Sequence, residues 1–326
     1  MILMRETQRL QSGINWDKRL MESVYGLIKA REVLMKGIFF LCAVFSILAL
    51  ATITVFLLVS GIPFIAETGV GEFLLGLKWS PLADSPSYGI LPMIAATLYV
   101  TALSVVIGLG TGLLTAICLF KFCNKKLVPF VRQMINLLAG IPSVIFGLFG
   151  MTVIVPFIRD YISPNGVGYG ILSSSLVLGI MVLPTIVSVS LDAMNSVPES
   201  YYEGALALGA TKEQATFKIM LPAAKSGILA GAVLAIGRAV GETMAVIMVI
   251  GGSPEMPNSL FQSVRTMTAN IAMGAMELSG DALSALIATG VVLFVFTLLL
   301  NISFSMLKRD KSGSVKKSKG ASNEKA

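Results

Sequence analysis

Six long stretches of this chain carry almost no ionisable side chain, and they constrain the fold more than any other feature. One stretch, residues 226–252, contains only Arg238 and Glu242 as charged residues. The other five contain none and are residues 37–66, 89–120, 133–158, 161–191 and 282–307. Each is long enough for the roughly 20 apolar residues that span a bilayer. Since only 13% of the residues are charged, the sequence predicts an all-α integral membrane protein with six transmembrane helices.

The lysines and arginines between these stretches predict the orientation. The N-terminal segment, the loops 121–132 and 192–225 and the C-terminal tail hold 21 of them, against three in the alternate loops. Positive residues stay in the cytoplasm, so both termini are expected there. The net charge of +7 follows from this topology and requires no nucleic-acid partner.

Three domains are expected along the chain. Residues 1–36 form a cytoplasmic N-terminal segment, in which 16–36 is either an amphipathic helix on the inner membrane surface or a plain cytoplasmic helix. Residues 37–307 form the six-helix transmembrane domain. Residues 308–326 are rich in Lys, Ser and Gly and are expected to be a disordered basic cytoplasmic tail.

Several kinds of chemistry are disfavoured by the composition. The chain has no histidine and only three cysteines, without a CxxC pair, so no metal site and no catalytic residue is expected. The glycine cluster at 108–112 lies inside a predicted span and indicates close helix packing. The stretch 204–211 has P-loop glycine spacing but Ala210 at the lysine position. The sequence therefore predicts no cofactor and no enzyme activity, with ATP hydrolysis on another subunit.

The segment 193–225, between two predicted spans, is expected to form a compact cytoplasmic helix–turn–helix. Pro198 and Glu199 suit a first helical turn, and Gly209 can end that helix in a left-handed conformation. Thr211 and Gln214 form a capping box for a second helix, which is expected to run to Leu221-Pro222. Its small and apolar surface either packs on the membrane domain or docks a soluble partner.

This segment resembles the cytoplasmic EAA loop of type I ABC importer permeases. The family pattern E-x-A-x-x-x-G, then nine residues, then I-x-L-P, is matched in spacing, and Gly204 replaces the family's first alanine. The matching residues are Glu203, Ala205, Gly209, Ile219, Leu221 and Pro222. The resemblance implies the type I ABC importer permease fold and a loop that docks on a separate ATPase subunit.

Three further stretches are similar to permeases of phosphate importers. They are LAGIPSVIFGLFG (138–150), WSPLADSPSYGILP (79–92) and GRAVGETMAV (237–246), the last resembling the PstC type of subunit. The resemblance implies a multi-pass protein of a prokaryotic plasma (cytoplasmic) membrane. It also implies a PstA-like permease subunit as heterodimer partner, two copies of an ATP-binding subunit and an extracytoplasmic phosphate-binding protein.

Arg238 and Glu242 are expected to share one face of the fifth helix, since they lie four residues apart. Either they form a buried structural pair, or they face a polar pathway in which Arg238 is a transient phosphate ligand. The resemblance implies the second role for both, and Thr243 adjoins them. Pro142 and Pro184 are expected to interrupt helices three and four, either as simple kinks or so that Ser143 and Thr185 line the path.

The sequence thus predicts a membrane-spanning permease subunit of an ATP-driven inorganic phosphate importer. One alternative is a permease for another oxyanion, such as sulfate, molybdate or phosphonate. Another is an ion-coupled carrier or channel that uses Arg238 and Glu242 directly, although such a carrier has no ATPase to receive a docking loop.

Overall fold

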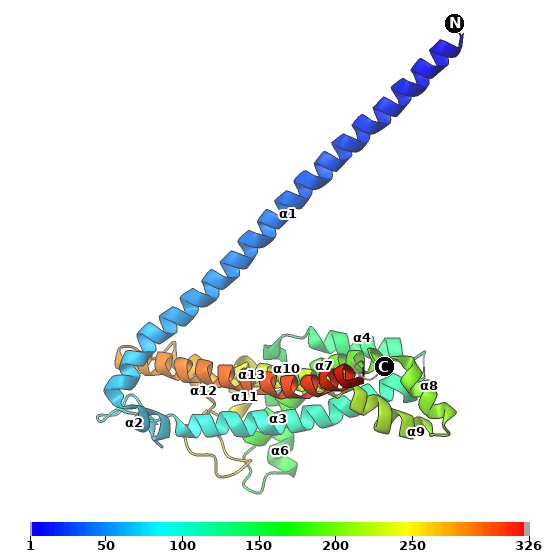
Figure 1. Ribbon diagram of the computed structural model, residues 1–326. Coiled ribbons are helices and arrows are strands. Elements are labelled where there is room, and N and C mark those ends of the chain that lie inside the picture. The colour runs from blue at the N-terminus through cyan, green and yellow to red at the C-terminus, as the bar shows by residue number, and fades with distance from the viewer. Residues whose placement is uncertain (1, 125, 323–326) are drawn as a thin grey trace. The chain divides into compact units, whose positions relative to one another are not determined.

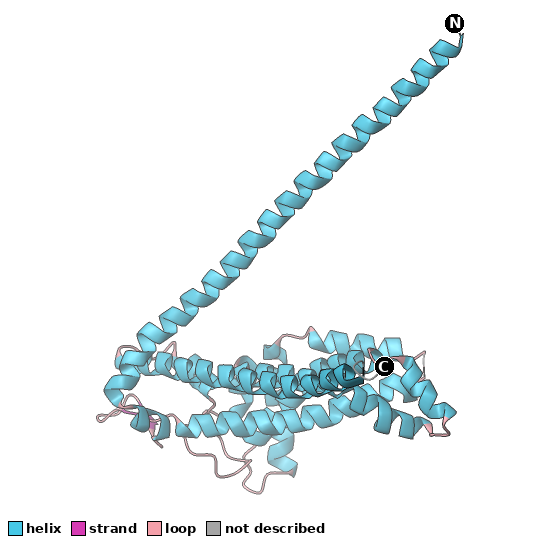
Figure 2. Cartoon of the chain, viewed as in Figure 1, coloured by secondary structure: helices cyan, strands magenta, loops and turns pink. Residues whose placement is uncertain are grey.

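The computed structural model describes the backbone of residues 2–124 and 126–322, and the side chains of residues 29, 31–124 and 126–303. Nearly all of this backbone is helical, with one short pair of strands (Figure 2). The chain divides into two compact units, residues 1–59 and 60–326. Because their relative placement is not determined, each unit is described by itself.

The first unit is a single helix, the N-terminal part of α1 (Ile2–Thr68). Apolar side chains from Val33 to Val59 are exposed along it, as expected for a helix that faces lipid or another chain. The segment 16–36 is helical, but it runs into the first span without a break. Its expected amphipathic face lies largely outside the described side chains.

Six helices in the described residues are long and apolar enough to cross a membrane, which agrees with the predicted number. The spans are Arg31–Thr68, Leu91–Phe122, Ser143–Tyr161, Ile171–Asn195, Lys212–Gly241 and Asp281–Ser303. The elements that build spans two to six are α3 (Leu91–Ile117) with η1 (Cys118–Phe122), α5 (Ser143–Phe149) with η2 (Gly150–Ile154) and α6 (Val155–Tyr161), α7 (Ile171–Asn195), α9 (Lys212–Gln214) with η3 (Ala215–Met220) and α10 (Leu221–Gly241), and α13 (Asp281–Ser322).

Three predicted spans have clearly different bounds in the structure, and the fourth of the six begins at Ile171 instead of residue 161. The third begins at Ser143 instead of residue 133, because α4 (Val128–Ala139) is a separate helix that ends before Pro142. Its Arg132 pairs with Asp192 of α7 at 2.6 Å. The fifth ends at Gly241 instead of residue 252, and the remainder forms the short helix α11 (Met244–Ile250).

One further expectation is wrong. The second helix of the 193–225 segment does not end at Leu221-Pro222, because η3 continues directly into α10, with Pro222 in the first turn of α10. The helix α13 continues from the sixth span to Ser322, and the expected disorder of the tail 308–326 stays a prediction.

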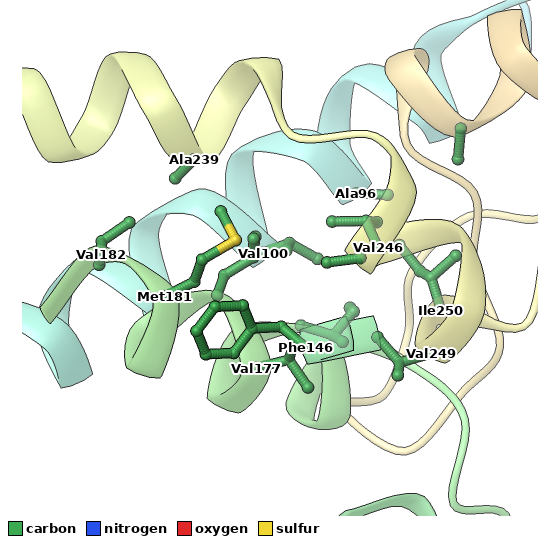
Figure 3. Packing of buried hydrophobic residues seen from close by; sticks show 14 of the residues in the cluster. Ala96, Val100, Phe146, Val177, Met181, Val182, Ala239, Val246, Val249 and Ile250 are labelled. Carbon is green, nitrogen blue, oxygen red and sulfur yellow. The ribbon is translucent and has the colours of Figure 1, made fainter. Parts of the chain in front are cut away.

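The main core of the second unit lies where several helices meet. Figure 3 shows Val100 of α3, Phe146 of α5, Val177 of α7, Ala239 of α10 and Val249 of α11 packed together, all of them buried. Because lipid is as apolar as these side chains, close packing holds such helices together more than exclusion of water does.

Glycines let α3 and α7 approach closely, as the cluster at 108–112 predicts. A Cβ added at Gly108 would lie 2.7 Å from Val182 Cγ2, and one at Gly112 would lie 2.9 Å from Ile186 Cγ2. Both distances are too short for real carbon contacts, so larger residues would force the helices apart. This cluster is therefore a packing feature of the membrane domain.

The segment after α1 forms a small layer at one end of the second unit. It contains α2 (Val70–Leu75) and the antiparallel strands β1 (Trp79–Ser80) and β2 (Ser87–Tyr88). Its aromatic side chains meet edge to face, with Tyr88 against both Phe64 and Trp79. Figure 1 shows α2 at the opposite end of this unit from α8 (Glu199–Ala207) and α9.

Candidate functional site

The fifth span breaks at Glu242 and Thr243. The α10 helix ends at Gly241, and Glu242 has extended backbone angles of φ −70° and ψ 130°. The chain then enters α11, whose Ala245 N–H donates to Glu242 Oε1 at 3.2 Å. Non-helical backbone at membrane depth is tolerated only where protein or water surrounds it, so the break marks a polar point in the membrane domain.

The predicted pairing of Arg238 with Glu242 does not occur. The two residues do not share one helix, and among the described residues neither forms an ion pair. The reason is the break itself, because the Glu242 carboxylate caps α11 instead of turning back along α10. No carboxylate among the described residues therefore holds Arg238.

Arg238 lies on a face of α10 that the described residues of the second unit leave uncovered. Leu234, Gly237, Arg238 and Gly241 are all exposed and recur at the spacing of one helix face. A Cβ added at Gly237 or Gly241 would meet nothing within 4 Å. A lipid-facing arginine would be expensive, so this face is suited to a second protein chain or a water-filled path.

Ser143 lies at the start of α5, directly after the break at Pro142 that the sequence predicts. Its helix packs on α11, since a Cβ at Gly147 would meet Ala245 and one at Gly150 would meet Val249. The two helices thus run in the same direction, and their first residues lie at a similar level. Ser143 is half-buried there, beside the level of Glu242 and Thr243.

Thr243 and Thr185 contribute differently. Thr243 lies in the break, where its Oγ1 donates to Gly241 O at 3.3 Å. Pro184 does not interrupt α7, which is continuous from Ile171 to Asn195. Thr185 is therefore half-buried on an intact helix, and the described residues show no hydrogen bond from it to the break.

A contact from outside the fifth span holds the break, and it is not among the predicted site contacts. Thr268, on α12 (Met267–Gly274), donates from Oγ1 to Glu242 O at 3.0 Å. The adjoining Met267 N–H donates to Thr97 Oγ1 of α3 at 3.1 Å. The sequence offers no signal for a bond between residues so far apart.

The predicted helix–turn–helix is present at the other end of the second unit, and we call residues 198–222 the coupling hairpin. Pro198 precedes α8, Gly209 has a left-handed φ of +87°, and Thr211 and Gln214 form the capping box. The Ala210 N–H donates to Ala205 O at 3.1 Å across the turn, which satisfies a carbonyl at the end of α8.

The coupling hairpin presents an apolar and small-residue surface. Leu208 at its tip is 91% exposed. Glu203, Gly204, Gly209, Ile219 and Pro222 are exposed, and Ala205 and Leu221 are half-buried. Below this surface Tyr202 is buried against Ala215 and Met220. The hairpin is thus packed on its inner side and free on its outer side, as a docking element requires.

A cation fixes the coupling hairpin to the second span. Lys121 Nζ lies 2.9 Å from Glu199 Oε1 and 4.3 Å from the centre of the Tyr202 ring. Nearby, the rings of Phe122 and Phe217 lie 6.5 Å apart. The coupling hairpin is therefore in direct contact with the end of the second span.

The chain matches known proteins over most of its length. Residues 108–313 match the family described as binding-protein-dependent transport system inner membrane component. A "Probable ABC transporter permease protein YqgH" of Bacillus subtilis is 40% identical, covering 79% of this chain and 84% of that protein. A "Phosphate transport system permease protein PstC" of Mesorhizobium japonicum is 36% identical, covering 73% and 78%.

A solved structure shares the fold. A chain of the MetNI methionine ABC transporter, in an inward-facing conformation, superposes with a TM-score of 0.54 at 20% sequence identity. The match covers 67% of this chain and 95% of that one. The fold is thus that of an ABC importer permease.

Proposed function

The chain belongs to the family of binding-protein-dependent transport system inner membrane components, and we propose that it is a membrane-spanning permease subunit of an ATP-driven importer of inorganic phosphate. It is a multi-pass inner membrane protein of bacteria. It works with a second permease, an ATPase and a substrate-binding protein. The chain itself is a transport subunit and not an enzyme.

The observation that carries the phosphate assignment is the broken fifth span with Arg238 beside it. An arginine at membrane depth with no carboxylate partner among the described residues can receive an anion. Its planar fork can donate two parallel hydrogen bonds to an oxyanion such as phosphate. The relative from Mesorhizobium japonicum, which is named for phosphate transport, supports this choice of substrate.

We assign the pathway to the uncovered face of α10 and the adjoining break. Arg238 would bind phosphate transiently, while Glu242 and Thr243 shape the break and Ser143 adds a hydroxyl beside it. Thr185 belongs to the same path but lies on α7, on the cytoplasmic side of the break. A PstA-like permease would cover this face, so that the pathway lies between the two membrane subunits.

The coupling hairpin would receive the ATPase. Its docking residues are Glu203, Gly204, Ala205, Gly209, Ile219, Leu221 and Pro222. Two copies of an ATP-binding subunit would serve the two permeases. Their closure on ATP would move the hairpins together, and Lys121 would pass this movement to the second span. Such rigid-body movement converts an outward-open pathway into an inward-open one.

The domain limits follow the same assignment. Residues 1–36 and 308–326 would lie in the cytoplasm with the coupling hairpin, and 37–307 would hold the permease. An extracytoplasmic phosphate-binding protein would dock at the opposite end, near α2 and the strand pair. It would provide most of the selectivity, so that the site at Arg238 can bind weakly and release its substrate.

Reconstitution in vesicles tests this function. The chain would be assembled with its neighbouring permease, ATPase and binding protein, and uptake of labelled phosphate would be measured with and without ATP. We expect ATP-dependent uptake that unlabelled phosphate suppresses and sulfate does not. Equal suppression by sulfate, molybdate or a phosphonate would assign another oxyanion. Uptake driven by an ion gradient without ATP would assign an ion-coupled carrier.

A further inference from the structure

A cavity lined by Arg265 lies outside the fifth span. It has a volume of about 300 Å³ and is bounded by the strand pair and α12. Trp79, Ser80 and Pro81 form one wall, and Asn270, Met273 and Gly274 form another. Arg265 and Glu277 are its charged residues. The cavity belongs to the loops that the charge pattern places outside the cell.

Arg265 is held in a fixed orientation in this cavity. Its Nε donates to Gly252 O at 2.7 Å, and its Nη1 donates to Asn270 Oδ1 at 3.2 Å. The Nη2 nitrogen has no acceptor among the described residues, and no carboxylate of that part of the chain lies within ion-pair distance. The guanidinium is therefore oriented by neutral oxygens and keeps donors available.

The orientation of Arg265 is accompanied by an unsatisfied buried donor on Asn270. Asn270 is only 1% exposed, and its Nδ2 is buried without a hydrogen-bond partner. Leaving a buried donor unsatisfied costs about 1–3 kcal/mol. The amide cannot turn over to relieve this, because its oxygen accepts from Arg265. We attribute the unsatisfied amide of Asn270 to its role in orienting the Arg265 guanidinium.

Electrostatics favour a ligand of negative charge. Burial lowers the pKa of Arg265 below its ordinary value, and the Glu277 carboxylate acts in the opposite direction. Glu277 is exposed at the cavity, where water screens its charge. A half-buried guanidinium without a paired carboxylate is stabilised by an anion that enters the cavity.

The helix α12 connects the cavity to the break in the fifth span at Glu242 and Thr243. Arg265 and Asn270 flank the first turn of α12, and Thr268 in that turn donates to Glu242 O. A ligand that shifts α12 would thus act on the break beside Arg238.

We propose that this cavity is an outer anion site in which Arg265 binds a tetrahedral oxyanion of the phosphate class before it reaches Arg238. This inference rests on the proposed function. Binding is weak, because one arginine supplies the charge and Glu277 opposes it. The site receives the anion released at the outer face and passes it inward.

Trp79 provides a direct reporter, since it lines the cavity and is almost fully buried. The assembled transporter in phosphatidylcholine nanodiscs is titrated with inorganic phosphate at constant ionic strength, with chloride as the reference anion. We expect a saturable change in tryptophan fluorescence that Trp79→Phe removes. Arg265→Gln should weaken phosphate binding at least about tenfold, and Arg265→Lys should weaken it less. Glu277→Gln should strengthen it.

Lys78→Gln is the matched control, because it removes the same charge next to Trp79 from an exposed residue that does not line the cavity. It should leave the titration unchanged. An unchanged titration in Arg265→Gln, or an equal effect of Lys78→Gln, would overturn the proposal. So would a signal that responds only to the binding protein. Loss of the phosphate response in phosphatidylglycerol nanodiscs would assign the cavity to a lipid headgroup instead.

The ATP-driven uptake assay separates this inference from the proposed function. Normal phosphate uptake with no saturable Trp79 signal would refute the outer site alone. Absence of phosphate uptake by the assembled wild-type transporter would refute the proposed function as well.

Discussion

Thr268 Oγ1 donates a hydrogen bond of 3.0 Å to the carbonyl oxygen of Glu242. This bond joins α12, which borders the outer cavity, to the break that ends α10. The Glu242 side chain meanwhile accepts from Ala245 N–H and caps α11. The break is thus held on two sides, and its geometry depends on an element outside the fifth span.

Removal of the Thr268 hydroxyl should loosen the break. A neutral hydrogen bond contributes about 1 kcal/mol, so Thr268→Val should lower phosphate uptake per assembled complex by roughly fivefold. Thr268→Ser keeps the hydroxyl and should retain most of the activity. Equal uptake by the Val and Ser variants would show that this bond does not control the pathway.

Gly209 should be essential to coupling. Its φ of +87° is unfavourable for a β-branched residue, so Gly209→Val should detach or uncouple the ATPase while the membrane helices still insert. Gly166→Val is the matched control, because it places the same side chain at another glycine of positive φ (+66°), with nothing within 4 Å of its Cβ position and outside the coupling hairpin. Co-purification of the ATPase measures docking. Wild-type yield and uptake in Gly209→Val would refute the assignment of the coupling hairpin.

Cysteine labelling tests the orientation. In a background without Cys42, Cys118 and Cys123, a Ser85→Cys variant should react with an impermeant thiol reagent added to intact cells. Ser200→Cys on α8 should react only after the cells are opened. Both serines are exposed in the structure, so in a chain expressed without its ATPase and binding protein access depends on the membrane alone. The reverse pattern would place the coupling hairpin outside the cell and exclude ATPase docking there.

The sequence predicts the spans well because charge-free length is a direct requirement of the bilayer. The coupling hairpin is also predictable from sequence. Its turn depends on the left-handed Gly209 and on the capping box of Thr211 and Gln214, which all act within a few residues. The boundary at 133 is wrong because apolar length does not distinguish a spanning helix from α4, whose Arg132 pairs with the distant Asp192.

The break in the fifth span could be anticipated only in part. Gly241 followed by Thr243 resembles a helix stop and a new start, yet a continuous helix satisfies the apolar pattern equally well. In the structure the break is accompanied by the bond from Thr268, 26 residues away, which the local sequence does not reveal. The outer cavity could not be predicted for a similar reason. Arg265 and Asn270 line a cavity only because the strand pair, distant in sequence, lies opposite them.

The central claim is that Arg238 binds the transported anion and does not neutralise Glu242. The most direct test is phosphate uptake, normalised to assembled complex, by Arg238→Gln, Glu242→Gln and the double variant. Glu242→Gln keeps an oxygen that can cap α11 and should retain part of the activity. Arg238→Gln and the double variant should both assemble, bind the ATPase and fail to transport, because the anion ligand is absent in each. Near-normal uptake by the double variant would contradict this account, since it would show that the two charges serve only to balance each other.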